Sequence, residues 1–260
     1  MGRGLAHYEI KGQVAIVTID HPPMNALDTA TKEDIGQVFL DLDDGHEEIR
    51  TVILCGAGEK AFAAGADIKT FLELDPDTAK KRLLRSHQIY AIVENFRWPV
   101  IAAIHGYCLG GGLELALCCD IRYADESAKL GFPEVNLSIF PGNGGTQRAL
   151  YHMSLGKLKE LVFTGAMIEA QEALSYGLLD HVVPDGQVLD ASMELANKII
   201  GKGPLGVAAA KKVLNRTRDL SLTDGLELES DFWSNLTATE DMKEGATAFI
   251  EKRKPNYRCR

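Results

Sequence analysis

Three consecutive glycines at positions 110–112 constrain this chain more than any other feature, because an apolar run follows them at once. Glycine has no Cβ, so a glycine triplet lets the backbone come close to a ligand or to another segment. The run Leu113, Leu115, Ala116 and Leu117 predicts a helix that begins at the glycines. The first N–H groups of a helix are unpaired and carry partial positive charge, so this turn can hold a developing oxyanion.

Two glutamates accompany this turn. Glu114 follows Gly111 by three residues, which places it on roughly the same face of the predicted helix. Glu134 comes directly after Pro133, which ends the preceding predicted strand. Two carboxylates beside one anion hole are a layout for proton transfer on either side of a carbonyl-bearing substrate. Tight packing of the glycines and a dipole-complementing role for Glu114 remain the alternatives at this point.

A second glycine element favours the catalytic interpretation. Residues 63–69 (AAGADIK) follow the apolar strand predicted at 52–54 and precede a helix-like stretch, as the first element does. A site with two backbone donors needs two such turns.

The segments that carry these features also match a known family in order and in combination. They are residues 25–27 (NAL), 60–69 (KAFAAGADIK), 99–114 (PVIAAIHGYCLGGGLE), 119–121 (CDI), 132–134 (FPE), 141–148 (PGNGGTQR), 166–179 and 249–254 (FIEKRK). The chain resembles the enoyl-CoA hydratase (crotonase) family along essentially its whole length.

The resemblance implies a coenzyme A thioester substrate and no separate cofactor or metal. It places the oxyanion hole at the N–H groups of Ala66 and Gly111 and the catalytic carboxylates at Glu114 and Glu134. Since many relatives with other activities keep one of these carboxylates, the pair favours hydration of a trans-2-enoyl-CoA to a 3-hydroxyacyl-CoA. A Δ3,Δ2-enoyl-CoA isomerase is the alternative within the family. The substrate-binding residues it implies are Ala64, Ala66, Asp67, Ile68, Lys69, Gly111 and Lys252.

The expected fold is α/β. The resemblance implies a crotonase-like spiral of repeated ββα units over residues 1–200, which holds the CoA and active site. Residues 201–260 are then a helical oligomerisation region that forms trimers, paired into a hexamer, in which Lys252 completes a neighbour's CoA site. The sequence departs from the family pattern at Ser138, Phe140 and Asn143, which bears on acyl-chain preference more than on reaction class.

The local patterns predict particular elements. Strands are expected at 14–20, 52–55, 100–104, 121–124 and 129–130, and beyond residue 147 the pattern is almost wholly helical. Asp28 is expected to cap a helix that runs to about residue 44, and a long amphipathic helix is expected over 76–96.

Composition excludes several classes of protein. No apolar run approaches the roughly 20 residues that span a bilayer, and residues 1–9 have no signal-peptide character, which predicts a cytoplasmic protein. Five cysteines without framework spacing predict reduced thiols. The net charge of −9 argues against bulk binding of nucleic acid. A basic patch at 80–87 (KKRLLRSH) leaves RNA binding as a minor alternative to a solvated helix face.

Overall fold

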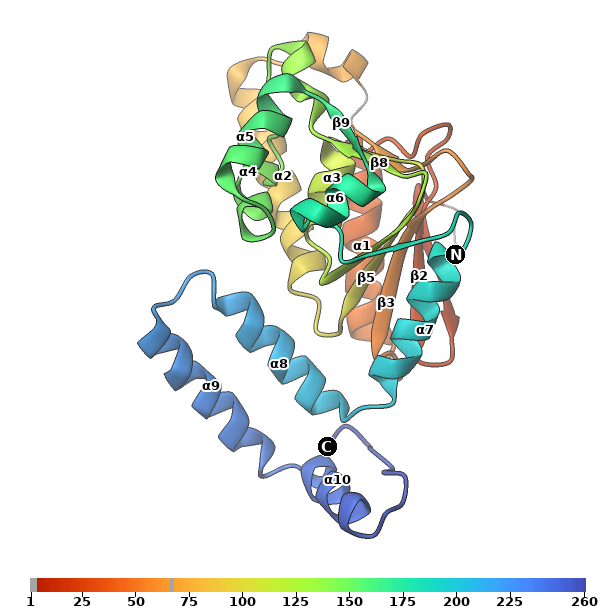
Figure 1. Ribbon diagram of the computed structural model, residues 1–260, viewed down its shortest axis with the longest axis vertical. Helices are drawn as coiled ribbons and strands as arrows, with labels where there is room; N and C mark the ends of the chain where they lie inside the picture. Colours follow the sequence, from red (N-terminus) through yellow and green to blue (C-terminus); the bar gives the residue numbers. More distant parts are fainter. Residues whose placement is uncertain (1–3, 66–67) are drawn as a thin grey trace.

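The computed structural model describes residues 4–65 and 68–260 and shows a body with two β-sheets (Figure 1). Within these residues the larger sheet has six strands in the order β1-β2-β3-β5-β7-β10. β1 pairs with β2 in antiparallel fashion, and the other neighbours are parallel. The strands are β1 (Ala6–Lys11), β2 (Val14–Ile19), β3 (Thr51–Gly56), β5 (Val100–Ile104), β7 (Ile121–Asp125) and β10 (His181–Val183).

The smaller sheet has the order β4-β6-β8-β9 and is parallel except at β9. Its strands are β4 (Ala61–Ala64), β6 (Tyr107–Leu109), β8 (Lys129–Gly131) and β9 (Met167–Glu169). The chain alternates between the sheets, so that β3, β4 and a helix are followed by β5, β6 and another helix. This alternation confirms the repeated ββα units that the sequence predicts.

The central strands β2, β3 and β5 of the larger sheet are buried on both faces. Val52 and Leu54 of β3 lie in the main hydrophobic core, whereas Ile53 between them lies in a second cluster with Val188 and Ala196 of α7. Successive side chains of a strand point to opposite faces, and strands that are covered on both sides are apolar at every position. The helices α1, α2 and α3 therefore pack against one face, and α7 packs against the other.

The helices of the body connect and cover these strands. They are α1 (Thr29–Gly45), α2 (Pro76–Glu94), α3 (Gly111–Ala116), α4 (Gly145–Arg148), α5 (Leu155–Thr164), α6 (Ala170–Tyr176) and α7 (Val188–Ile200), with short 3-10 turns η1 (Ile68–Glu73), η2 (Pro133–Leu137) and η3 (Ala149–Tyr151). No helix in the described part of the chain is long and apolar enough to cross a membrane.

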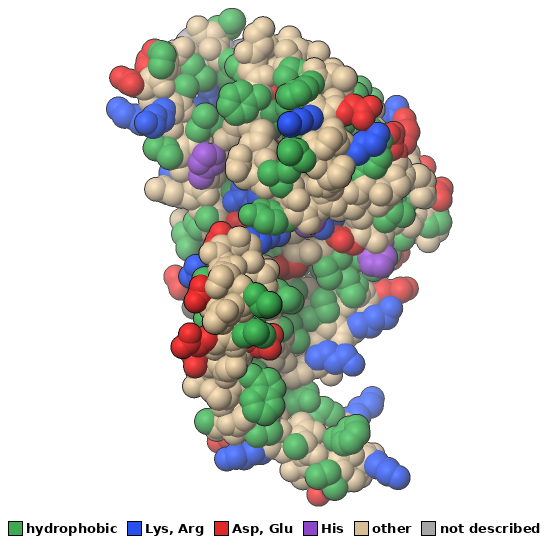
Figure 2. Space-filling view, turned by 60° about the vertical axis from the view of Figure 1, so that its left-hand side comes forward, with side chains coloured by type: hydrophobic (Ala, Val, Ile, Leu, Met, Phe, Trp, Pro, Cys, Tyr) green, Lys and Arg blue, Asp and Glu red, His purple; other side chains and the backbone are tan. Residues whose placement is uncertain are grey.

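Three C-terminal helices form an arm that extends away from the body (Figure 1). They are α8 (Pro204–Arg216), α9 (Leu222–Leu236) and α10 (Glu240–Ile250). No residue of α9 is buried, and hydrophobic side chains lie along the arm in the space-filling view (Figure 2). The last residues fold back on α10, where the buried Asp241 accepts hydrogen bonds from the N–H groups of Arg258 and Cys259.

The predicted helix starts are confirmed. Asp28 accepts a hydrogen bond from Thr31 N–H at 2.8 Å, and Asp75 caps α2. The sequence did not predict β1, β4, β6, β9 and β10. Four of these strands have three or four residues, too few for a period of two to be recognised.

Candidate active site

The two glycine turns and Glu134 lie at one edge of the smaller sheet. The parallel register sets Ala64 of β4 opposite Leu109 of β6, and Leu109 opposite Gly131 of β8. The chain leaves the carboxyl ends of these strands into the first glycine turn, the glycine triplet and the Pro133 segment. Carboxyl ends of neighbouring parallel strands meet at one edge, which is the usual place for a binding site in an α/β sheet.

The glycine triplet makes close contacts that only glycine permits. Gly110 has φ +53°, and a Cβ there would lie 2.8 Å from Oε1 of Glu134. A Cβ on Gly112 would lie 2.0 Å from the carbonyl oxygen of Ala63, so α3 begins directly against β4. Glu114 N–H donates the first helical hydrogen bond to the Gly110 carbonyl, which leaves Gly111 N–H ahead of the helical ladder. The predicted donor therefore lies at the predicted turn.

Glu114 is a fully buried carboxylate that accepts three hydrogen bonds from N–H donors. Oε1 accepts hydrogen bonds from Asn143 N–H at 2.7 Å and from Gly145 N–H at 2.9 Å. Oε2 accepts one from Asn143 Nδ2 at 2.8 Å. The residue is 0% exposed. These three N–H donors fix the orientation of the Glu114 carboxyl group.

Glu134 has the opposite environment. It is the second residue of η2, and its Oε2 is buried without a hydrogen-bond partner in the part of the chain that the structure describes. Burial, and then the charge of Glu114, raise the pKa of Glu134 to about 7. Two neighbouring carboxyl groups whose environments differ in this way can serve as base and acid in one reaction.

The first glycine turn is only partly within the described residues. Ala64 ends β4, and Gly65 has φ +78° and accepts a hydrogen bond at its carbonyl oxygen from Leu27 N–H at 2.8 Å. Asn25, itself at φ +54°, donates its side-chain amide to the carbonyl groups of Ala57 and Ala61 and so ties down the β3–β4 connection. The structure thus gives a physical role to the segment at 25–27. Ala66 and Asp67 lie outside the described residues.

Two other predicted binding residues, Ile68 and Lys252, are not brought to the carboxylates by the described contacts. Ile68 begins η1 and is 56% exposed, and the backbone of Lys69 follows it in the same turn. Lys252 comes just after α10, which lies at the far end of the arm from α3 and β8 (Figure 1). The neighbouring Arg253 is paired with Glu244 and Glu251, so the basic tail is partly neutralised within the arm.

Sequence reasoning missed the residues that hold the site in shape. Gly145 was noted within a family segment but not as a donor to Glu114, and Asn143 was assigned to acyl-chain preference. Tyr90, which is 0% exposed, donates its hydroxyl to the Gly111 carbonyl at 2.9 Å. Its place in the apolar face of α2 resembles that of any core residue, so the pattern held no signal for it.

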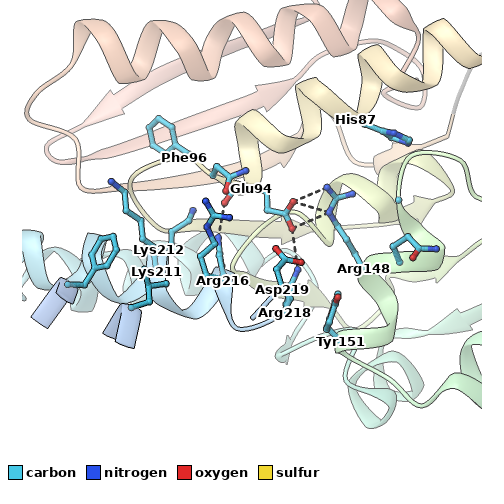
Figure 3. A pocket seen from close by; sticks show the side chains of 16 residues that line it. His87, Glu94, Phe96, Arg148, Tyr151, Lys211, Lys212, Arg216, Arg218 and Asp219 are labelled. Atoms are coloured by element: carbon cyan, nitrogen blue, oxygen red, sulfur yellow. Dashed lines mark hydrogen bonds and ion pairs between the residues drawn. The ribbon is translucent and has the colours of Figure 1, made fainter. Parts of the chain in front are cut away.

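A separate cavity of about 950 Å³ lies between the body and the arm (Figure 3). It is lined by residues of α2, α4, α8 and α9, and neither Glu114 nor Glu134 lines it. At its wall Glu94 pairs with Arg148 at 2.8 Å and with Arg218 at 3.2 Å. This cluster joins the end of α8 to the body and belongs to the packing of the arm, not to the carboxylate pair.

Comparison with known proteins gives concordant results. Residues 9–260 match the family described as enoyl-CoA hydratase/isomerase. The chain is 41% identical to a short-chain-enoyl-CoA hydratase of Clostridium acetobutylicum over 95% of this chain and 94% of that protein. It is 38% identical to a crotonyl-CoA hydratase of Syntrophomonas wolfei over 96% of both chains. The crystal structure of an enoyl-CoA hydratase from Bacillus anthracis superimposes with a TM-score of 0.93 at 38% identity, covering 98% of this chain and 100% of that one.

Proposed function

The chain belongs to the enoyl-CoA hydratase/isomerase family, and we propose that Glu114 and Glu134 are the two groups with which it hydrates a trans-2-enoyl-CoA. Its activity is that of an enoyl-CoA hydratase, a hydro-lyase whose product is the 3-hydroxyacyl-CoA. The observation that supports the assignment of residues is the contrast between a carboxylate with three N–H donors and a neighbouring carboxyl group whose pKa is about 7.

In the proposed reaction, Glu114 accepts a proton from the water molecule whose oxygen attacks C3. The electron pair of the double bond moves toward the thioester, and negative charge develops on its oxygen. Glu134 then donates its proton to C2, so that the elements of water are added and no electrons are gained or lost. The chemistry of the two carboxyl groups calls for no metal or redox cofactor, because coenzyme A enters as part of the substrate.

The developing oxyanion is assigned to the N–H groups of Gly111 and Ala66. A preorganised backbone donor of this kind is worth roughly 3–4 kcal/mol in the transition state. The position of Gly111 at the start of α3, opposite the end of β4, supports this assignment.

The isomerase alternative requires one carboxylate to carry a proton between C2 and C4. Direct assay separates the two activities. Hydration of a trans-2-enoyl-CoA is measured as the loss of the conjugated double bond, and isomerisation of a 3-enoyl-CoA is measured as the formation of a conjugated double bond. We expect hydration to exceed isomerisation by at least tenfold. The reverse ratio would contradict the proposal.

Short acyl chains are the proposed substrates, because the two relatives compared by sequence are named for short-chain-enoyl-CoA and crotonyl-CoA. A rate profile across enoyl-CoA chain lengths tests this and should fall steadily beyond four carbons. The proposal does not extend to RNA, since Arg85 of the basic patch pairs with Glu33 and His87 contacts the Gly142 carbonyl.

The proposed assembly is a homo-oligomer in which the arm contacts neighbouring subunits. Support comes from the exposed hydrophobic side chains on the arm, among them Leu222, Leu226, Trp233, Phe249 and Ile250. Lys252, close to that surface, is then placed to complete a neighbour's CoA site. The proposed location is the cytoplasm, which suits the five free cysteines.

A further inference from the structure

A lysine is buried close to the catalytic carboxylates without a carboxylate of its own. Lys32 of α1 is 5% exposed, and no ion pair joins it to a carboxylate among the described residues. Its Nζ instead donates to Ser86 Oγ at 3.1 Å and to Asn143 Oδ1 at 3.3 Å. Burial of an ammonium group is unfavourable in free energy, so a lysine at such a position is expected to have a functional role.

Asn143 joins this lysine to Glu114. Its Oδ1 accepts the hydrogen bond from Lys32, and its Nδ2 donates to Glu114 Oε2 at 2.8 Å. An ammonium group can only donate, and a carboxylate can only accept. The two partners therefore determine which way the amide faces, which hydrogen-bond geometry alone often leaves open.

Building on the role proposed for Glu114, we propose that Lys32 and Asn143 are a pair of positioning residues for the hydration reaction. The lysine fixes the side-chain amide of Asn143, and the amide holds Glu114 in the orientation in which it accepts a proton from water. The charge of Glu114 in turn favours the charged form of the lysine. Asn143 stands where the family pattern has a small residue. Lys32 provides the hydrogen-bond partner that orients the side chain of Asn143.

The charges around Lys32 are consistent with this role. Burial, and then the charge of Arg82, lower its pKa to about 8, while Glu114 and Asp28 act in the opposite direction. The ring of Tyr90 lies 5.9 Å from its Nζ. The Lys32 ammonium is therefore still charged at neutral and acidic pH.

Removal of the Lys32 charge should lower activity without lowering stability. Since the folded-state pKa of Lys32 lies below its ordinary value, the buried charge destabilises the fold fully below pH 8, and the effect disappears as pH rises toward the ordinary value. Lys32→Met removes that charge and keeps the length of the side chain. The variant should melt no lower than wild type at pH 7 and yet be slower, whereas a purely structural lysine would lose both together.

A double-mutant cycle tests the pair. Full-length wild type, Lys32→Met, Asn143→Leu and the double variant are assayed for hydration of crotonyl-CoA from about pH 5 to about pH 9. Each single change should lower kcat about tenfold with KM little changed, because each removes a hydrogen-bonded contact that supports a charged group. The double variant should be no slower than the slower single variant, since both changes break one arrangement.

The control is Lys198→Met, which removes an exposed lysine from α7 and should leave rate, profile and melting unchanged. Additive losses of rate would overturn the pairing, and so would a Lys32→Met variant that melts well below wild type. Wild type without hydratase activity would instead refute the proposed function. If wild type is active and Glu114→Gln is inactive, the proposed function is supported. The double-mutant cycle then tests the role of Lys32 and Asn143 by itself.

Discussion

At the scale of single residues, the site separates two chemically identical carboxyl groups by their surroundings. Three N–H donors satisfy Glu114, while Glu134 is left with a buried oxygen that has no partner among the described residues. The pKa of Glu134 is about 7 because of its burial and the nearby charge of Glu114. A group of this kind carries its proton in about half of the molecules at neutral pH and can deliver it.

The pH dependence follows from the protonated form of Glu134. Below pH 7 the proton is present, and as pH rises through about 7 the acid is lost, so hydration should slow on the alkaline side with a midpoint near that pH. The rate profile of kcat/KM checks this. An alkaline limb that begins only above about pH 9 would contradict the assignment of Glu134 as the acid.

Glu134→Gln keeps the shape of the side chain but removes the titratable proton. We expect kcat to fall by about 10²–10⁴, with KM little changed. Because the folded-state pKa is raised above the ordinary value, ionisation of Glu134 destabilises the wild-type fold progressively as pH rises from about 4.5 to about 7. The variant lacks that penalty, so at pH 8 it should melt no lower than wild type. Activity within threefold of wild type would remove Glu134 from the mechanism.

Glu114→Gln should have the same effect on kcat and a different effect on stability. The side chain of Glu114 faces N–H donors at both oxygens, so an amide there must point its own NH₂ group at another donor or give up contacts. That mismatch should cost about 1–3 kcal/mol of unfolding free energy. Chemical denaturation of Glu114→Gln and Glu134→Gln side by side should show the loss only for the former.

At the scale of elements, the site depends on how closely α3 approaches β4 and η2. Gly110, Gly111 and Gly112 follow one another in the chain, yet a Cβ would meet different surroundings at each. At Gly112 it would meet backbone at 2.0 Å, whereas at Gly111 its nearest contact would be 3.6 Å away. The triplet therefore combines a packing requirement at one position with a donor at another.

Gly111→Pro tests the donor. Gly111 is the first residue of α3, a position where proline is tolerated, and the change removes the N–H outright. Activity should fall by at least about two orders of magnitude. Gly111→Ala is the matched control, because it keeps the N–H and has room for a methyl group. A folded and active proline variant, with folding checked by circular dichroism, would show that the oxyanion is held elsewhere.

Gly112→Ala tests the packing requirement. The added methyl group would collide with the carbonyl of Ala63, which is backbone in β4 and cannot move aside cheaply. We expect a loss of about 3 kcal/mol or more in unfolding free energy. Thermal melting beside Gly111→Ala measures the difference, and equal stability of the two variants would mean that α3 can shift away from the sheet.

At the scale of the whole molecule, the arm exposes hydrophobic side chains that the packing of a single chain does not bury. Figures 1 and 2 show α8–α10 extending from the body with hydrophobic side chains along it. Within the chain, the Glu94 cluster and the contact of Lys211 with Asp120 tie α8 to the body. Exposed apolar surface of this extent usually marks an interface.

Light scattering on the intact protein should therefore report a mass several times 28.4 kDa, as expected for a trimer or a hexamer with closed symmetry. Truncation after about residue 245 removes the end of α10 and Lys252. It should weaken CoA binding more than it slows reaction of bound substrate, so KM should rise more than kcat falls. A stable, fully active monomer would contradict both the interface and the shared CoA site.

The sequence alone determined the fold class and the positions of the two carboxylates proposed as catalytic, because those features are local or lie in contiguous motifs. Asp28 caps its helix from three residues away, and Gly110–Gly112 and Glu114 are consecutive or nearly so. Periodicity and capping act over such distances, so a sequence displays them directly.

Only the tertiary structure decided what surrounds the carboxylates. The donors to Glu114 come from residues about 30 positions away, and Lys32 meets Asn143 across 111 positions. No local pattern encodes such a meeting, since it arises where α1, α2 and the segment before α4 pack together. The difference between an anion with three donors and an acid with a pKa near 7 is therefore a property of packing, although both side chains are glutamates.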